Sequence, residues 1–374
     1  MGRDRRVLGN SQRLVVKVGT SSITHAGGRL NLHQMRRLAG QLAELRKRGK
    51  EVLLVSSGAI GAGLGRLGLT RRPRTIPECQ ALAAVGQGIL MHVYEQIFAE
   101  YDIVVGQVLL TREDFADRRR FLNARHTLTS LLQFGAIPII NENDTVAVDE
   151  IKFGDNDNLA ALVAGLVDAE LLILLSDIDG LYTDDPRRCP EARLIREVEE
   201  ITPEIEALAR GTGAALGTGG MVTKLQAAHV AGHCGVTVVI ARADEKDVIL
   251  RIVAGEEIGT VFWPVTRLEN RKRWIAYSSP VQGRIVVDEG AVRALHAGKS
   301  LLPSGVVAVE GTFEMGNTVS IVDPRGKEIA RGIVNFSAGE VDKIKGCRTS
   351  EIAGILGHKD YDEVVHRNNL VLGP

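Results

Sequence analysis

Six polar clusters between residues 17 and 224 of this 374-residue chain carry the groups that could do chemistry. They combine lysine ammonium groups, carboxylates, side-chain amides and glycine-rich backbone. Such groups bind phosphates and carboxylates at the ends of strands and the starts of helices. The clusters are residues 17–22, 56–63, 141–144, 154–158, 176–182 and 217–224.

Lys17 and Lys224 are the two cations in these clusters. Lys17 lies within the apolar run 14–18, where an unpaired buried lysine would be costly. It is either a snorkelling side chain on an edge strand or a cation directed at a phosphate. Lys224 ends the glycine-rich segment 217–224, which lacks the residue order of a Walker A loop. That segment is either a structural glycine turn or a phosphate site made of backbone amides and a helix N-terminus.

Carboxylates and amides gather in three further clusters. Residues 141–144 read Asn-Glu-Asn-Asp and follow a predicted strand, whereas residues 154–158 read Gly-Asp-Asn-Asp-Asn and open a predicted helix. One Asp or Asn is enough to cap a helix, and surplus carboxylates repel one another unless a cation offsets them, so these clusters favour ligand binding over capping alone. The spacing does not fit an EF-hand. Ser176 and Asp177 precede Asp179-Gly180, which is either a plain turn or a loop facing a nucleotide.

The segment 56–63 contains glycines that would let backbone N–H groups approach an anion. We interpret it as a carboxylate- or phosphate-binding loop, with a tight structural turn as the alternative. Residues 63–68 also match the G-x-G-x-x-G pattern, but they begin seven residues beyond the predicted strand. A dinucleotide fingerprint belongs in the strand–helix turn itself, so this match is a weak signal.

The polar clusters lie between short apolar runs and segments with helical periodicity, which alternate along the chain. Continuous apolar strands separated by helices predict an α/β fold: an open, mainly parallel sheet sandwiched by helices. Ligands bind such sheets at the carboxyl ends of the strands, where the polar clusters lie. The predicted strands are 14–18, 52–56, 103–109, 136–140, 171–175 and 236–240, and the predicted helices lie between Asn31 and Gly49 and at 79–98, 120–133, 156–167 and 221–232.

The sequence changes character after Trp263-Pro264. A charged segment, 267–274, is followed by short strand-like runs with glycine and proline between them, which predict a small mixed β-barrel. Its strands are expected at 283–287, 306–309, 318–322 and 329–334, and its helices at 289–297 and 338–345. We therefore expect a large domain over 11–263, a linker over 264–280 and a small domain over 281–367.

Composition excludes several classes of protein. The 46 basic and 46 acidic residues give zero formal net charge, and residues 281–374 hold 11 basic and 12 acidic residues, so tight nucleic-acid binding is not expected. The four cysteines form no C-x-x-C motif, and His229 and His233 belong to no H-E-x-x-H motif, which argues against a disulfide scaffold and a zinc site. We expect a soluble cytoplasmic protein, since no targeting or membrane-spanning segment is recognisable.

Taken together, the motifs resemble the glutamate 5-kinase family of amino-acid kinases. The resemblance rests on Val-Lys17-Val-Gly-Thr-Ser, Ser56-Ser-Gly-Ala-Ile, Ile-Asn141-Glu-Asn-Asp, Gly154-Asp-Asn-Asp-Asn and Gly217-Thr-Gly-Gly-Met-x-Thr-Lys. The tail from about Gln282 resembles a PUA domain. The resemblance implies an amino-acid kinase fold and ATP-dependent phosphorylation of the γ-carboxylate of L-glutamate to L-glutamyl 5-phosphate, the first step of proline biosynthesis, with Mg²⁺ on the nucleotide.

The resemblance also implies roles for individual residues. Lys17, Lys224 and Asp157 are the expected catalytic residues, and Ser57, Asp144 and Asn156 the expected glutamate-binding residues. Asp155 and Asp157 would orient the lysines, the metal or the substrate ammonium, and Asp155 is the one candidate metal ligand. Ser176 and Val222 depart mildly from the family, which often has Thr and Ser there. The expected ATP contacts are Lys17, Ser176, Asp177, Thr218, Gly219, Gly220, Met221, Val222, Thr223 and Lys224.

The same resemblance implies partners: proline as feedback inhibitor, a homo-oligomer (dimer or tetramer) and a glutamyl-phosphate reductase that takes over the product. Neither a membrane nor a nucleic acid is expected as a partner. Three alternatives remain open on the sequence. They are a related kinase acting on aspartate, acetylglutamate, carbamate or a nucleoside monophosphate, an RNA-binding protein acting through the tail, and a dinucleotide-dependent dehydrogenase.

Overall fold

The computed structural model describes residues 4–25, 27–69, 71, 73, 75–146, 156–211, 220–264 and 280–373. The chain divides into two compact units. One comprises Met1–Asp114 and Phe121–Arg267, and the other comprises Phe115–Arg120 and Leu268–Pro374. Each unit has its own buried hydrophobic cluster.

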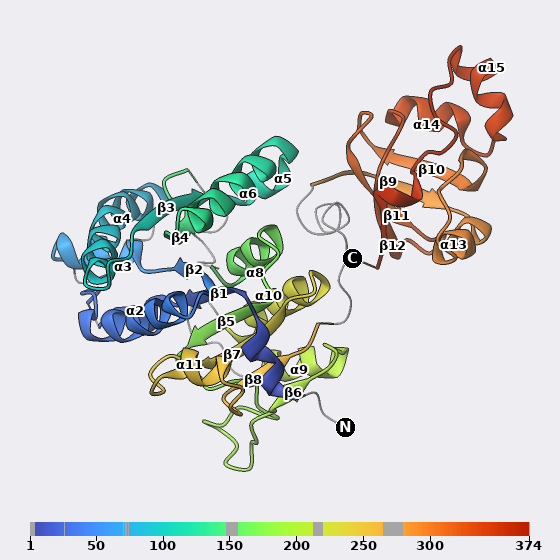
Figure 1. The fold of residues 1–374 in the computed structure, drawn as a ribbon. Helices are drawn as coiled ribbons and strands as arrows, with labels where there is room; N and C mark the ends of the chain where they lie inside the picture. Colours follow the sequence, from blue (N-terminus) through green and yellow to red (C-terminus); the bar gives the residue numbers. More distant parts are fainter. Residues whose placement is uncertain are drawn as a thin grey trace. The chain divides into compact units, whose positions relative to one another are not determined.

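Strands and helices alternate through the larger unit, as the apolar pattern predicts (Figure 1). Its strands are β1 (Arg13–Val18), β2 (Glu51–Ser56), β3 (Val105–Leu110), β4 (Ile137–Glu142), β5 (Leu171–Ser176), β6 (Glu197–Val198), β7 (Thr237–Arg242) and β8 (Thr260–Phe262). Its helices are η1 (Arg5–Asn10), α1 (Thr20–Ile23), α2 (Leu32–Lys47), α3 (Ala59–Arg66), α4 (Ile76–Ala99), α5 (Arg112–Ala116), α6 (Arg118–Gln133), α8 (Asn156–Leu166), α9 (Pro203–Gly211), α10 (Met221–His233) and α11 (Val248–Val253).

The strands form one sheet in the order β3-β4-β2-β1-β5-β7-β8-β6. Among the described strands of this sheet, every pairing is parallel except that of β7 with β8, which confirms the predicted mainly parallel sheet. The chain continues from β1 to β2 on one side, while from β5 it continues to β6 and then β7, both on the other side. The carboxyl ends of β1 and β5 therefore lie at the switch point of the topology, where open α/β sheets bind ligands.

Helices cover both faces of the sheet (Figure 1). Helices α2, α4 and α11 pack with one face, and their apolar side chains join those of the strands in a single core cluster. That cluster includes Val16 and Val18 of β1. Helices α8 and α10 pack against each other, α8 against β1 and β5 and α10 against β7. Since strand side chains alternate between faces, Lys17 points to the face opposite Val16 and Val18.

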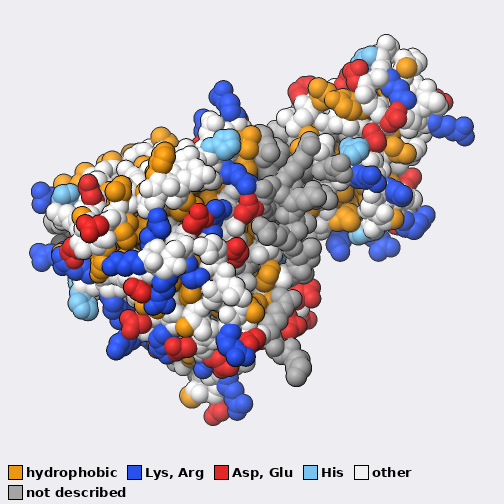
Figure 2. All heavy atoms as spheres, viewed as in Figure 1, with side chains coloured by type: hydrophobic (Ala, Val, Ile, Leu, Met, Phe, Trp, Pro, Cys, Tyr) orange, Lys and Arg blue, Asp and Glu red, His pale blue; other side chains and the backbone are white. Residues whose placement is uncertain are grey.

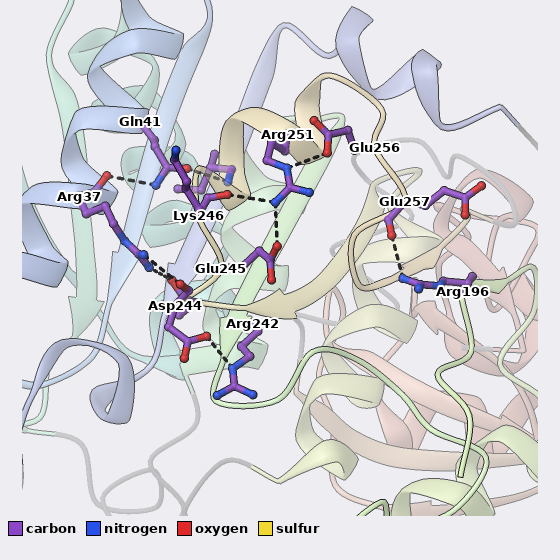
Figure 3. Close-up of polar contacts among 12 residues, drawn as sticks. Arg37, Gln41, Arg196, Arg242, Asp244, Glu245, Lys246, Arg251, Glu256 and Glu257 are labelled. Atoms are coloured by element: carbon purple, nitrogen blue, oxygen red, sulfur yellow. Dashed lines mark hydrogen bonds and ion pairs between the residues drawn. The ribbon is translucent and has the colours of Figure 1, made fainter. Parts of the chain in front are cut away.

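Polar contacts fasten α2 to the segment that follows β7 (Figure 3). The Arg37 guanidinium donates to the carbonyl oxygens of Ala243 and Asp244 at 2.7 and 2.9 Å. Gln41 Oε1 accepts the backbone N–H of Ile249 in the first turn of α11 at 2.9 Å. These bonds tie α2 to backbone groups at the carboxyl end of β7 and the start of α11, and the carbonyl oxygen of Ala243 also accepts from Gln34 Nε2 at 2.7 Å.

Glycines allow α3 and α4 to cross at very short distance. A Cβ on Gly86 of α4 would overlap the carbonyl oxygen of Ala59, and a Cβ on Gly63 of α3 would overlap that of Leu82. Gly58, which precedes α3, has φ of 107°, in the left-handed region that favours glycine. The glycines of 58–63 thus serve chain geometry and helix packing, which the sequence interpretation did not include.

The smaller unit contains one mixed five-stranded sheet in the order β10-β9-β11-β12-β13, in which only the β9–β11 pairing is parallel. The prediction of a small mixed β-domain is confirmed, although the sequence missed β13. The elements are β9 (Val281–Val287), α13 (Glu289–His296), η3 (Pro303–Gly305), β10 (Val306–Gly311), β11 (Thr318–Val322), β12 (Glu328–Ile333), α14 (Ala338–Ile344), η4 (Thr349–Glu351), α15 (Ile352–Leu356), η5 (Arg367–Asn369) and β13 (Leu370–Leu372).

Acidic and basic side chains are mixed over the face of the larger unit that Figure 2 shows. This mixture accords with the equal numbers of acidic and basic residues in the sequence. Among the described helices, none is long and apolar enough to cross a membrane.

Candidate functional site

Lys17 is buried on the central strand of the sheet. Strand β1 pairs with β2 on one side and β5 on the other, so a snorkelling lysine on an edge strand is excluded. Only 6% of Lys17 is exposed, and its Nζ lies 2.6 Å from Oδ1 of Asp157 in the first turn of α8. This ion pair satisfies an ammonium group that would otherwise be costly to bury.

Lys224 reaches the same carboxylate from α10. Its Nζ lies 3.0 Å from Oδ2 of Asp157, and the residue is 3% exposed. The preceding residue, Thr223, has its Oγ1 3.1 Å from Asp157 Oδ2 and 2.8 Å from the carbonyl oxygen of Gly220. The two lysines thus meet at one carboxylate, although they lie far apart in the sequence.

Asp157 is ionised between the two ammonium groups. Burial alone would raise the pKa of this carboxyl, but Lys17 and Lys224 outweigh burial and lower the pKa below its ordinary value. Among the described residues, two ammonium groups and one carboxylate thus gather at the carboxyl ends of the strands. An anionic ligand is therefore favoured at this position.

The start of α10 supplies further groups for an anion. Gly220 is the N-cap residue of this 13-residue helix and has no side chain to cap it, and the first-turn amides of a helix are groups that bind anions. Met221 is buried, whereas Val222 is 39% exposed and points away from the core. The predicted ATP contacts Thr218 and Gly219 lie outside the described residues.

Ser176 and Asp177 end the neighbouring strand β5. Ser176 is buried as the last residue of the strand, and its hydroxyl donates to Asp177 Oδ1 at 3.0 Å. Because β5 pairs with β1, this pair lies at the same edge of the sheet as Lys17. The structure therefore brings together the described part of the predicted nucleotide site.

A cavity of about 300 Å³ lies beside the lysine pair at the ends of β2 and β4. The three predicted glutamate-binding residues, Ser57, Asp144 and Asn156, all line it, together with Asn141 and Glu142. Asn156 precedes Asp157 directly. Consecutive residues at the start of α8 therefore serve the cavity and the lysine pair.

A chain of hydrogen bonds links the polar residues of this cavity. Asn156 Nδ2 donates to Ser57 Oγ at 2.8 Å and to Asn141 Oδ1 at 2.9 Å. Asn141 Oδ1 also accepts the backbone N–H of Glu142, and Asn141 Nδ2 donates to Gln87 Oε1 at 2.8 Å. These hydrogen bonds fix which atom of each side-chain amide can face a ligand.

Two local expectations from the sequence were wrong. The segment after Gly58 is a helix, α3, rather than a loop, although residues 57–61 do line the cavity. Gly63 and Gly65 lie within that helix, so they form no strand–helix phosphate turn, and the dinucleotide interpretation fails. Asn141 and Glu142 are the last residues of β4 rather than residues beyond it.

Sequence reasoning missed two polar residues of α4 that support the site. Gln87 bonds to Asn141, and Tyr94 OH lies 2.8 Å from the hydroxyl of Ser56, which precedes Ser57. Burial raises the pKa of the Tyr94 phenol, while the hydrogen bond to Ser56 lowers it less. For Gln87, the sequence offered one signal: its polar side chain stands between the apolar positions Leu82 and Leu90 of a predicted helix.

Few side chains among the described residues of the site could bind a metal ion. Within the described residues, no group of three or more histidine, cysteine, aspartate or glutamate side chains could hold one. Asp157 is occupied by the two lysines. Asp155, the candidate metal ligand from the sequence, lies outside the described residues.

Each of the two units matches the model of a known protein family. The model of the "Amino acid kinase family" matches residues 12–242, and the model of the "PUA domain" matches residues 283–356. A glutamate 5-kinase of Moorella thermoacetica is 58% identical over 98% of both chains. Another, of Caldanaerobacter subterraneus subsp. tengcongensis, is 56% identical over 96% of this chain and 97% of the relative. A solved UMP kinase from Bacillus anthracis matches with a TM-score of 0.46 and 18% identity, covering 69% of this chain and 98% of that chain.

The match of the amino acid kinase model spans more than half of the chain, and the two relatives align with it almost from end to end. Their identity extends through both units. This chain belongs to the glutamate 5-kinases of the amino acid kinase family and carries a PUA domain.

Proposed function

We propose that this enzyme catalyses transfer of the γ-phosphoryl group of ATP to the γ-carboxylate of L-glutamate, forming L-glutamyl 5-phosphate for proline biosynthesis. One structural observation supports the proposed chemistry. Two buried lysines converge on Asp157, and the residue just before it in the chain, Asn156, lines an amino-acid-sized cavity. The arrangement pairs a site for phosphates with a site for a small polar substrate.

The nucleophile needs no general base. A glutamate side chain has a pKa near 4.3, so the γ-carboxylate is already ionised at neutral pH. One of its oxygens attacks the γ-phosphorus while the bond from that phosphorus to the β,γ-bridging oxygen breaks. The electron pair of that bond leaves with ADP. The difficulty is the repulsion between two anions rather than the basicity of the nucleophile.

Lys17 and Lys224 address this repulsion. Their ammonium groups would contact the phosphoryl oxygens on which charge accumulates during transfer, as in other phosphoryl-transfer enzymes. Asp157 holds both in place before ATP arrives. Ser176, Asp177 and residues 218–224 complete the proposed ATP site, in which the backbone amides of α10 bind phosphate oxygens.

Mg²⁺ is part of the proposal as a partner of the nucleotide. When bound to the phosphates, it neutralises part of their charge. Because Asp157 already contacts both lysines, the metal would be held through the phosphate oxygens of the nucleotide.

The cavity suits the zwitterionic end of an amino acid. Ser57 Oγ accepts a hydrogen bond from Asn156, so its own hydroxyl hydrogen can be donated to a carboxylate. Asn156 uses both Nδ2 hydrogens within the protein, and its buried Oδ1 accepts from no group among the described residues. It can accept from an ammonium group. The Asp144 carboxylate at the rim adds negative charge for the same ammonium.

We also propose a domain organisation and a set of partners for this enzyme. The kinase domain would span 11–263, the linker 264–280 and the PUA-like domain 281–367. Proline would compete at the glutamate site, the chain would form a homo-oligomer, and a glutamyl-phosphate reductase would take over the unstable product. The role of the tail can be tested by deleting the residues beyond about 275 and measuring the activity and the oligomer mass of the shortened enzyme. This experiment separates a role in assembly from a regulatory role.

A hydroxamate trap tests the proposed reaction. Purified enzyme with ATP, Mg²⁺, glutamate and hydroxylamine should yield glutamyl hydroxamate together with ADP. Aspartate, acetylglutamate, carbamate and UMP, each in place of glutamate, should release ADP at less than about one hundredth of that rate, because recognition of a polar substrate by buried groups discriminates strongly. ADP release with one of these compounds and none with glutamate would overturn the proposal.

A further inference from the structure

Gln87 of α4 lies behind the cavity and is absent from its lining. It reaches the cavity through two amides: its Oε1 accepts from Asn141 Nδ2, and Asn141 Oδ1 accepts from Asn156 Nδ2. Asn141 and Asn156 are both buried. Such a chain transmits orientation because each amide must present its oxygen to a donor and its nitrogen to an acceptor.

A backbone group sets the direction of this chain. The N–H of Glu142 can only donate, and it donates to Asn141 Oδ1 at 2.9 Å. Asn141 must therefore direct its nitrogen to Gln87, and Asn156 must direct its nitrogen to Asn141. The buried Oδ1 of Asn156 is left as an acceptor with no partner among the described residues.

The orientation of Gln87 itself is dictated by Asn141. Its buried Nε2 has no hydrogen-bond partner among the described residues. Rotating the amide by half a turn would bring two donors, Gln87 Nε2 and Asn141 Nδ2, against each other. An unpartnered buried donor is costly, and native proteins keep few of them, so its retention indicates a purpose beyond packing.

We propose that Gln87 is a positioning residue for substrate selection: it holds Asn141, and through it Asn156, so that Asn156 Oδ1 faces the α-ammonium group of the amino-acid substrate. This inference rests on the proposed function. Without the Gln87 acceptor, Asn141 Nδ2 loses its partner, so the Asn141 amide is held at its oxygen alone and the amide of Asn156 no longer presents a fixed acceptor. Glutarate, which is glutamate without its ammonium group, does not use that acceptor.

The test compares Gln87→Met with the matched variant Gln96→Met. Gln96 lies on the same helix but is exposed. Gln87→Met should raise the KM for glutamate by about 10- to 100-fold, the loss expected for one hydrogen bond to a charged group. The inhibition constant of glutarate, the KM for ATP and the kcat should each stay within about threefold of wild type. Gln96→Met should change none of these constants.

Gln87→Glu provides the rescue. It keeps an oxygen acceptor at the same distance from the backbone, so its KM for glutamate should stay within about threefold of wild type. If Gln87→Met weakens glutamate and glutarate equally, or if Gln87→Glu behaves as Gln87→Met does, the side chain merely supports the fold and the inference is wrong. Failure of the wild-type enzyme to form glutamyl hydroxamate would instead refute the proposed function.

Discussion

Lys224 Nζ donates a hydrogen bond of 3.0 Å to Oδ2 of Asp157, which lies 67 positions earlier in the chain. Both side chains are almost completely buried. The lysine is therefore positioned by the folded protein before any nucleotide binds. Charge that is held in place in advance requires no reorganisation during the reaction, which is the main source of electrostatic catalysis.

Replacing Lys224 with Ala should lower kcat by about 10²–10³-fold, the usual effect of removing one preorganised stabilising group. The KM for glutamate should change little, because the cavity residues remain in place. Initial rates of ADP release at varied glutamate concentration provide the measurement. Lys246→Ala, which removes an exposed lysine, is the control. A change in KM alone would remove Lys224 from the chemistry.

Asp157→Asn should damage both rate and stability. The variant keeps the shape of the side chain but removes the negative charge that faces both buried ammonium groups. Breaking a buried ion pair in this way costs about 3–5 kcal/mol of unfolding free energy. Urea unfolding and initial rates should show both losses. A variant as stable as wild type would mean that the lysines find other partners.

Asp157 also predicts how stability depends on pH. Its pKa is lowered in the folded protein from the ordinary 3.8. The unfolded chain therefore binds the proton more readily, and the stabilisation is complete above the unfolded pKa and lost as pH falls through the folded pKa. The unfolding free energy of wild type should decrease from about pH 5 downward. Asp157→Asn should show a shallower decrease, and an identical slope in both proteins would contradict the prediction.

Local patterns were enough to predict the parallel sheet and the polar clusters. Each apolar run, such as 52–56 or 171–175, is long enough to be a buried strand and too short for a helix, and its environment in the sheet is uniform. The expectation that two lysines converge was also met, since both stand at strand or helix ends that a parallel sheet gathers at one edge.

Long-range pairing could not be predicted. Asp157 could have served the lysines, a metal or the substrate ammonium, and only the crossing of α8 over β1 places it against Lys17. The helix α3 was missed because its three glycines lower intrinsic helix propensity, whereas close packing on α4 compensates in the folded chain. Gln87 was missed because nothing local marks one amide in an apolar helix as a partner of Asn141.

Asp144 should act on substrate binding rather than on turnover. Asp144 lines the cavity together with Asn156 and Ser57. Asp144→Ala should raise the KM for glutamate by about 10-fold or more, since an interaction between charged groups is lost, and leave the KM for ATP unchanged. Steady-state kinetics with each substrate varied in turn would show this. An unchanged KM for glutamate would refute the binding role of Asp144.

The crossing of α3 and α4 predicts opposite effects for one substitution at two positions of the same helix. Gly86→Ala places a methyl group against the carbonyl oxygen of Ala59, so α3 must move away. Overpacking of this kind costs about 1–3 kcal/mol. The displacement of α3 also shifts Ser57, which precedes the helix, and should raise the KM for glutamate.

Gly88→Ala provides the matched control. Apart from its chain neighbours and the backbone of its own helix, no atom of the described residues lies within 4 Å of the position where its methyl group would stand. Alanine is favoured over glycine within a helix by about 0.5–1 kcal/mol, so this variant should unfold at a slightly higher temperature than wild type. Thermal unfolding should thus move in opposite directions for the two variants. If both substitutions shift the transition the same way, the helices do not meet at Gly86, and the support of Ser57 by α4 fails with that contact.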